Sequence, residues 1–154
     1  MRSAPPSLFN VVTEVGAMAP DPQPADEVVR LLLVEDDPEI ARMYQLKLEL
    51  DGYSVEFAGD GETAIRMATE NPPDLLFLDI RLPGMSGLEL LQALREKEAT
   101  RSLPVVILSA FDEPELRAAG IELGALEYLI KSQTTPGEVS GNVGGWLESP
   151  PPEE

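Results

Sequence analysis

Polar side chains that can do phosphoryl or metal chemistry stand directly after short apolar runs. They are Glu35, Asp36 and Asp37, then Asp79, Ser109 and Lys131. Clustered carboxylates repel one another, so a cation or bound protons must relieve their charge. Oxygen ligands at a partly hydrated site suit Mg²⁺ or Mn²⁺. One such carboxylate can attack phosphorus as a nucleophile, and an ammonium and a hydroxyl can then pair with the phosphoryl oxygens.

The composition narrows the chemistry further. The chain of 154 residues contains no cysteine and no histidine, which excludes thiol catalysis, Ser-His-Asp triads and zinc sites that need those ligands. It has 11 basic and 28 acidic residues, a net charge of -17. Such a charge argues against nucleic-acid partners and against anionic membrane surfaces. No apolar run approaches the roughly 18 residues of a membrane span, and no signal peptide is recognisable. We therefore expect a cytoplasmic protein.

The segments that must position these side chains alternate in character. Residues 28–34, 74–78, 105–108 and 128–130 are nearly continuous apolar runs, and residues 53–57 alternate between polar and apolar. Apolar stripes of helical period lie between the runs: Ile40, Met43, Leu46 and Leu50; Leu90, Leu91 and Leu94; Leu116, Ala119 and Leu123. Pro38 suits a first helical turn, with Asp37 as a possible cap.

This alternation predicts an α/β fold of three layers, in which helices cover both faces of a five-stranded parallel sheet. The alternating second strand belongs at an edge, which gives the strand order 2-1-3-4-5. Ligands then bind beyond the carboxyl ends of strands 1 and 3, where the order reverses. An aspartate after a strand is commonly only a helix cap, and that reading stays open for Asp37. The combination of acids, Ser109 and Lys131 at strand ends nevertheless predicts one shared pocket.

The sequence around these residues resembles the receiver domain of two-component response regulators, particularly the single-domain, chemotaxis-regulator-like kind with a flavodoxin-like fold. The resemblance extends over about residues 29–147 and is carried by four motifs in order: LLVEDDP at 32–38, DLLFLDIRLPGMSG at 74–87, PVVILSA at 104–110 and GALEYLIK at 124–131.

The resemblance implies a role for each site residue. Asp79 is the expected phosphoacceptor, and Mg²⁺ is expected on Glu35, Asp36, Asp79 and the backbone carbonyl of Arg81. Ser109 and Lys131 are expected to bind the phosphoryl group. Ser109 and Tyr128 form the expected switch, in which Tyr128 turns inward as Ser109 moves toward the phosphoryl group. The remaining expectation is that Arg81 and Phe111, two residues beyond Asp79 and Ser109, tune the lifetime of the phosphoform.

The resemblance also implies the partners. The phosphodonor is expected to be a phosphohistidine on a sensor histidine kinase or phosphotransfer protein, because this chain has no histidine. Output is expected through a downstream protein target, from a monomer or weak dimer. We expect a signalling protein rather than a separate enzyme, although one that participates in its own phosphorylation and dephosphorylation. Residues 28–147 form the expected receiver domain, without an output domain, between disordered extensions at 1–27 and 148–154.

Two features depart from the family pattern. The family has a proline, after a cis bond, where this chain has Ser132. A cis bond before a non-proline residue costs roughly 2.5–4 kcal/mol, so we predict a trans bond and a rearranged loop. The last helix contains glycines at 137, 141, 144 and 145, and we expect it to be marginal and anchored by Trp146.

Other interpretations remain open. Residues 59–64 (GDGETA) fit a dinucleotide-binding pattern, although a plain turn with Asp60 as a helix cap is the stronger interpretation. A Mg²⁺-dependent phosphatase needs a second acid where this chain has Arg81. A receiver that binds partners without phosphorylation is a third alternative. Apolar residues at helical spacing from Leu8 to Val15 suggest either a short partner-binding helix or an unstructured leader.

Overall fold

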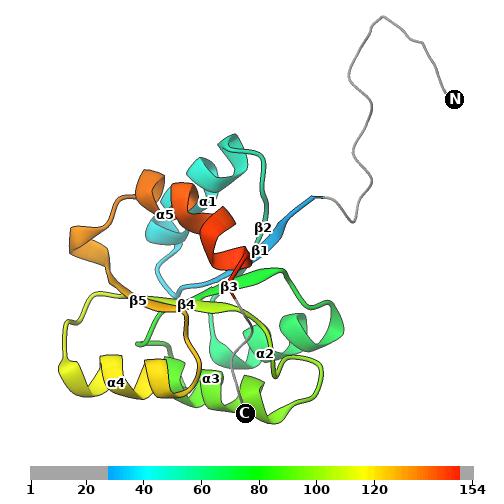
Figure 1. Cartoon of the computed structure of the whole chain (residues 1–154), viewed down its shortest axis with the longest axis vertical. Helices are drawn as coiled ribbons and strands as arrows, with labels where there is room; N and C mark the ends of the chain where they lie inside the picture. Colours follow the sequence, from blue (N-terminus) through cyan, green and yellow to red (C-terminus); the bar gives the residue numbers. More distant parts are fainter. Residues whose placement is uncertain (1–27, 150–154) are drawn as a thin grey trace, which may run out of the picture.

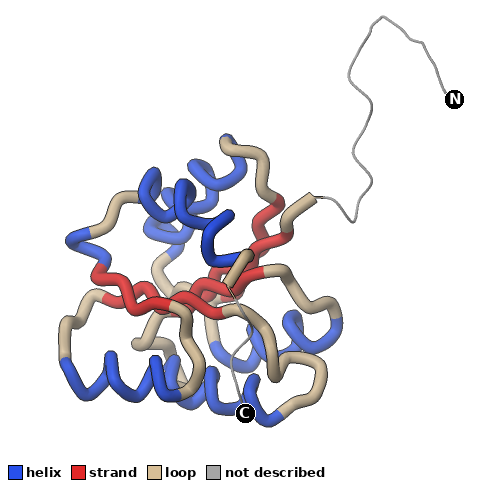
Figure 2. The backbone as a smooth tube through the Cα atoms, in the orientation of Figure 1, coloured by secondary structure: helices blue, strands red, loops and turns tan. Residues whose placement is uncertain are grey.

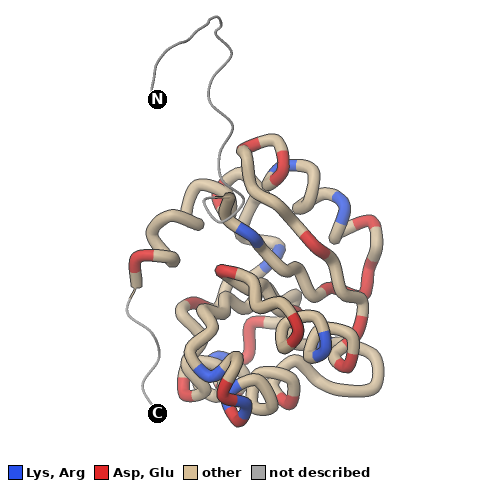
Figure 3. The backbone as a smooth tube through the Cα atoms, turned by 90° about the vertical axis from the view of Figure 1, so that its right-hand side faces the viewer, with Lys and Arg blue, Asp and Glu red and all other residues tan. Residues whose placement is uncertain are grey.

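The computed structural model describes residues 28–149. The expectations for residues 1–27, including the helical spacing at 8–15, and for the end of the chain beyond residue 149 lie outside the described residues. No helix in the described part of the chain has the length and apolar character needed to cross a membrane. Acidic positions are spread around this part of the chain, with fewer basic positions between them (Figure 3).

Five parallel strands form one sheet in the order β2-β1-β3-β4-β5, as predicted (Figure 1). They are β1 (Arg30–Val34), β2 (Ser54–Ala58), β3 (Leu75–Leu78), β4 (Val105–Ser109) and β5 (Glu127–Ile130). The interior strands β3 and β4 are buried along their whole length, whereas β2 exposes three of its five residues at the edge. Strands buried on both faces are apolar throughout, which explains the continuous runs in the sequence.

Helices cover both faces of the sheet and complete the three predicted layers (Figure 2). On one face lie α1 (Pro38–Leu50) and α5 (Pro136–Leu147); on the other lie α2 (Gly61–Glu70), α3 (Gly87–Glu96) and α4 (Pro114–Glu122). The sheet therefore separates two apolar cores. One core joins Phe77 to residues of α1 and α5, and the other joins Leu76 to residues of α2 and α3.

Side-chain caps explain where the helices begin. Asp37 accepts hydrogen bonds from the amides of Glu39 and Ile40, so its expected role as a cap is confirmed. Asp60 caps α2 by accepting from the Thr63 amide, which confirms the expected cap at the start of this helix. Capping boxes begin α3 at Ser86 and α5 at Thr135.

Three of the four residues of the first apolar stripe do not face the sheet, whereas Ile40 packs partly buried against the core. Met43, Leu46 and Leu50 are 48%, 53% and 80% exposed, and we call these three residues the α1 ridge. The buried face of α1 is instead made by Ala41, Tyr44 and Leu48. Because α1 carries apolar residues on two sides, helical spacing alone selected the wrong one. The second stripe, on α3, is fully buried as expected.

Of the two departures predicted near the C-terminus, the structure tests the peptide bond before Ser132, whereas the marginal stability of the last helix stays a prediction. The residues that the structure describes contain no cis peptide bond, so the expected trans bond before Ser132 is confirmed. This bond lies within a short 3₁₀ helix, η2 (Lys131–Gln133). The glycine-rich α5 is a continuous helix. Its Trp146 is buried, packs edge-on against Phe77 at 5.8 Å between ring centroids, and donates to Glu127 Oε1 at 2.7 Å.

Candidate functional site

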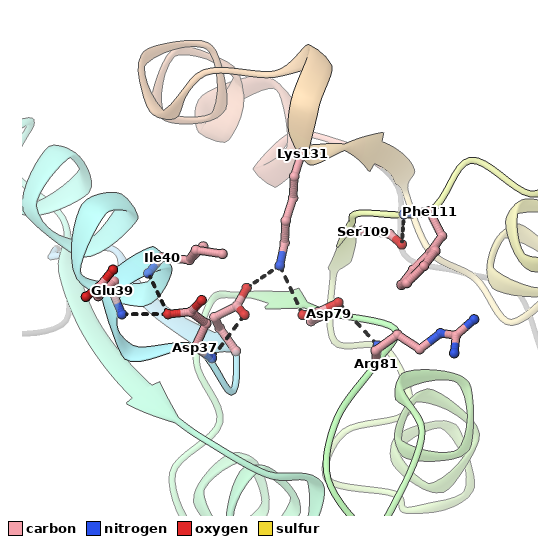
Figure 4. Close-up of polar contacts among 9 residues, drawn as sticks. Asp37, Glu39, Ile40, Asp79, Arg81, Ser109, Phe111 and Lys131 are labelled. Atoms are coloured by element: carbon pink, nitrogen blue, oxygen red, sulfur yellow. Dashed lines mark hydrogen bonds and ion pairs between the residues drawn. The ribbon is translucent and has the colours of Figure 1, made fainter.

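The carboxyl edge of the sheet gathers the polar residues that the sequence placed after its strands (Figure 4). Glu35 follows β1, Asp79 follows β3, Ser109 ends β4 and Lys131 follows β5. The order β1-β3-β4-β5 makes these four strand ends neighbours. Glu35 and Asp79 are only 3% and 6% exposed, so both carboxylates are surrounded by protein rather than by bulk water.

Three carboxylates from two strand ends form a cluster suited to a cation. One oxygen from each of Glu35, Asp36 and Asp79 lies within 4.8 Å of the others. Glu35 and Asp79 are buried, whereas Asp36 faces solvent. An all-oxygen donor set with an open side fits Mg²⁺, which binds through a few carboxylates and keeps several of its waters. The donor chemistry of the site therefore fits the expected metal.

Lys131 bridges two of these carboxylates. Its Nζ lies 2.5 Å from Glu35 Oε1 and 3.0 Å from Asp79 Oδ2 (Figure 4). One ammonium cannot neutralise two partly desolvated carboxylates. Burial raises the pKa of Glu35, and the hydrogen bond from Lys131 opposes this increase only in part. Burial works to lower the pKa of Lys131, but the hydrogen bond to Glu35 and the charge of Asp79 outweigh it and raise that pKa. Lys131 therefore stays charged.

Asp79 is positioned through its backbone as well as its side chain. Its Oδ1 accepts from the Arg81 amide at 3.2 Å. The Gly87 amide at the start of α3 donates to the Ile80 carbonyl at 2.7 Å. A β-carbon on Gly87 would collide with the Asp79 carbonyl oxygen. Sequence reasoning missed this role of Gly87, and its only local signal was a glycine directly after the Ser86 cap.

Asp37 does not join the acidic cluster. Its carboxylate is occupied at the start of α1, and its amide donates to Glu35 Oε2 at 3.2 Å. Of the three consecutive acids after β1, two therefore face the site and the third starts the helix. The amide of Asp37 also helps to fix the orientation of the Glu35 carboxylate.

Ser109 and Tyr128 meet at Phe111 rather than at Asp79. Ser109 is fully buried, and its Oγ accepts from the Phe111 amide at 3.0 Å. The Tyr128 hydroxyl donates to the Phe111 carbonyl at 2.8 Å, and the tyrosine is only 3% exposed. Both side chains thus hold the same residue of the β4–α4 loop. Tyr128 is already turned inward while Ser109 still contacts Phe111, so the expectation that the ring turns inward only as Ser109 moves is wrong for this structure. A shift of that residue would change both contacts together.

Arg81 and Phe111 lie against each other at the mouth of the site. The guanidinium carbon of Arg81 is 4.2 Å from the centre of the Phe111 ring, within cation–π range. Beside them is a hollow of about 370 Å³, lined by Asp36, Ile80, Arg81, Leu82, Pro83 and Ser86. The hollow opens next to Asp36, the exposed member of the acidic cluster, which leaves this side accessible from solvent.

Tyr44 on α1 is, after Gly87, a second residue near the site that sequence reasoning missed. Burial raises the pKa of its hydroxyl, and the charges of Lys131 and Glu35 act on it in opposite directions. The helical spacing of the exposed α1 ridge had drawn attention to the opposite side of α1.

Comparisons with known proteins agree with this geometry. A family model described as response regulator receiver domain matches residues 31–138. Transcriptional regulatory protein PrrA of Mycobacterium tuberculosis is 41% identical over 102 residues, which are 66% of this chain and 43% of PrrA. Alkaline phosphatase synthesis transcriptional regulatory protein PhoP of Bacillus subtilis is 38% identical over 114 residues, 74% of this chain and 46% of PhoP. The chain thus spans less than half the length of these two relatives.

Among solved structures, a CheY-like response regulator receiver domain protein from Methanospirillum hungatei superposes with a TM-score of 0.73 at 25% identity. The match covers 79% of this chain and 94% of that chain. The similarity therefore extends over nearly the whole of that receiver and over most of the residues described here.

Proposed function

Because the chain belongs to the response regulator receiver domain family of two-component systems, we propose that it is phosphorylated on Asp79. The donor is a phosphohistidine on a sensor histidine kinase or phosphotransfer protein. A carboxylate oxygen of Asp79 attacks phosphorus, the bond from phosphorus to the histidine nitrogen breaks, and the imidazole leaves. The observation that carries the proposal is the position of Asp79, buried between Lys131 and two further acids.

The surrounding residues have distinct roles in this proposal. Glu35, Asp36, Asp79 and the carbonyl of Arg81 hold Mg²⁺, which supplies charge neutralisation for the incoming phosphoryl group. Lys131 already contacts Asp79 Oδ2. Its ammonium is therefore placed to pair with the negatively charged phosphoryl oxygens after phosphorylation. Protein groups fixed around Asp79 before the reaction lower the cost of reorganisation during it. In this sense the chain contributes to its own phosphorylation.

The proposed output begins at Phe111. To reach a phosphoryl oxygen, Ser109 gives up its contact with the Phe111 amide. The Tyr128 hydroxyl is bonded to the carbonyl of the same residue, so the β4–α4 loop and Tyr128 respond together. The surface built from α4, β5 and α5 changes with them, and a downstream protein target reads that change. Residues 28–147 form the receiver unit in this proposal.

The α1 ridge is the proposed docking face for the phosphodonor. α1 begins at Pro38, directly after the acids of the site, so a protein that lies along the helix reaches Asp79. Met43 and Leu46 are about half exposed. Large apolar side chains grouped on one exposed helix face are typical of a surface that a partner covers. A small phosphodonor such as acetyl phosphate needs no such face.

The test is incubation of the full chain with acetyl phosphate and Mg²⁺, followed by intact-mass measurement. The wild type is expected to gain the mass of one phosphoryl group, and Asp79→Asn to gain none. Asp60→Asn is the matched control, because asparagine also caps a helix and Asp60 lies at the start of α2. A gain in Asp79→Asn would contradict the assignment. No gain in the wild type would favour a receiver that binds partners without phosphorylation.

A further inference from the structure

Arg117 on α4 covers the outer side of Tyr128. Its guanidinium carbon lies 4.9 Å from the centre of the tyrosine ring. Its Nη1 donates to the backbone carbonyl of Tyr128 at 3.2 Å, and its Nη2 contacts Asp112 Oδ1 at 3.2 Å. One side chain thus joins α4, β5 and the loop that follows Ser109.

The remaining sides of Tyr128 are held by the fold itself. The hydroxyl is fixed on the Phe111 carbonyl at 2.8 Å. A β-carbon on Gly120, which is buried on α4, would lie 3.8 Å from a ring carbon of Tyr128. The side chain of Arg117 is 44% exposed while Tyr128 is 3% exposed. Arg117 therefore stands between the ring and solvent, where an outward rotation would carry the ring.

We propose that Arg117 is a positioning residue that holds Tyr128 in its inward rotamer before Asp79 is phosphorylated. The importance of this rotamer for signalling rests on the function proposed above, but the contact itself does not. A cation over an aromatic ring at a partly exposed site changes a two-state ratio by about two- to fivefold. The hydrogen bond to the Tyr128 carbonyl fixes where the guanidinium sits, and Asp112 orients it from the loop.

An ordinary surface ion pair does not account for this geometry. Arg117 and Asp112 are both exposed, and such pairs contribute little to stability. The ion pair also leaves two contacts unexplained, because the ring and the carbonyl that Arg117 touches both belong to Tyr128. A planar guanidinium can stack on a ring and donate in its own plane at the same time.

The experiment uses the full, unphosphorylated chain with 3-fluorotyrosine and fluorine NMR. The chain has three tyrosines, and Tyr128→Phe assigns the signal of interest. Solvent access to Tyr128 is read from the shift of its signal between H₂O and D₂O. Arg117→Met keeps the aliphatic stem and removes the cation. Arg66→Met is the matched control, because Arg66 is a similarly exposed arginine paired with Glu70 on α2.

We expect Arg117→Met to increase the solvent shift of the Tyr128 signal about two- to fivefold, or to split that signal, while Arg66→Met leaves it unchanged. Tyr44 is buried and reports that the chain is folded. An unchanged Tyr128 signal in folded Arg117→Met overturns the proposal. If that variant does not fold, Asp112→Asn decides: a more solvent-accessible Tyr128 supports the proposal, and an unchanged one overturns it. Since no phosphoryl group is involved, failure of Asp79 phosphorylation would not produce either result.

Discussion

Gly87 packs directly against the backbone of Asp79, at a separation that leaves no room for a side chain. A β-carbon at this position would collide with the carbonyl oxygen of Asp79 and would lie 2.7 Å from the Cα of Ile80. The obstacle is backbone rather than the end of a flexible side chain. The first turn of α3 and the proposed phosphoacceptor are therefore mechanically linked.

We predict that Gly87→Ala destabilises the chain by about 1–3 kcal/mol through overpacking and lowers the rate of Asp79 phosphorylation. The matched control is Gly141→Ala on α5, where an added β-carbon meets only open space. That control should stabilise the fold by about 0.5–1 kcal/mol, because alanine loses less backbone entropy in a helix. Urea unfolding gives both free energies. Equal effects of the two substitutions would contradict the proposed packing.

Removal of Lys131 separates metal binding from phosphorylation. Lys131→Met leaves Glu35 and Asp79 without their shared cation, so Mg²⁺ should bind several-fold more tightly, measured by calorimetry. Accumulation of phosphoryl groups from acetyl phosphate should fall about tenfold or more, because a charge-assisted contact worth roughly 1.5–3 kcal/mol is lost. Lys47→Met removes the same charge near the far end of α1 and should change neither. Weaker Mg²⁺ binding in Lys131→Met would count against this account.

The contact between Arg81 and Phe111 gives a prediction for phosphoform lifetime. Their bulk at the mouth of the site should restrict the water that attacks the phosphoryl group. The double substitution Arg81→Ala and Phe111→Ala should therefore dephosphorylate faster than the wild type, measured as loss of the phosphorylated mass after the donor is removed. The phosphorylated wild type is the reference in the same assay. An unchanged or slower rate in the double variant would falsify the prediction.

Arg95 on α3 stabilises two loops at once. Its side chain donates to the carbonyls of Thr100, Arg101, Leu103, Leu123 and Gly124. Arg95→Met leaves several half-buried carbonyls without these donors, so we expect a loss of about 2–4 kcal/mol in the free energy of unfolding. Arg66→Met on α2 should change it by less than about 0.5 kcal/mol. Comparable losses in both variants would show that the five hydrogen bonds of Arg95 stabilise the fold no more than the exposed ion pair of Arg66 does.

The hydrogen bond between Ser140 and Asp51 predicts a pH-dependent contribution to stability. The Ser140 hydroxyl lowers the pKa of Asp51, and Lys47 adds to that effect. The folded state then holds its proton less tightly than the unfolded state, so the stabilisation exists above the unfolded pKa of about 3.9 and disappears as pH falls through the folded value. Ser140→Ala should be less stable than the wild type at neutral pH, and the difference should shrink below about pH 4. Ser102→Ala, at an exposed turn, should show no such trend.

The sequence was sufficient for the sheet and for the cluster at its carboxyl edge. Four strands can be predicted from the sequence, because burial on both faces of a sheet requires continuous apolar residues. Parallel strands end at the same edge, so Glu35, Asp79 and Lys131 had to converge once the strand order was known. The predicted cap at Asp37 was also visible, because capping depends only on residues a few positions away.

Contacts between distant residues left no such pattern. The Arg95 side chain donates to the Leu123 carbonyl 28 positions later. Residue spacing cannot predict such a contact, because every residue has a backbone carbonyl and none is marked as the acceptor. On α1, apolar side chains at Met43 and Leu46 compete with Ala41 and Tyr44 for the buried face. Their spacing is equally helical, and only packing against the sheet decides between them. The hydrogen bonds that join Ser109 and Tyr128 to Phe111 likewise depend on the conformation of the β4–α4 loop, which could not be predicted from the sequence.

Trp146 is the one tryptophan of the chain, and the fold places it where an optical signal is useful. Its ring lies edge-on to Phe77, two residues before Asp79, and its indole nitrogen is bonded to Glu127 at the start of β5. The two strands that Asp79 and Lys131 directly follow therefore both border the same chromophore. Its emission is an intrinsic, label-free monitor of this sheet, in a protein where no second indole complicates the spectrum.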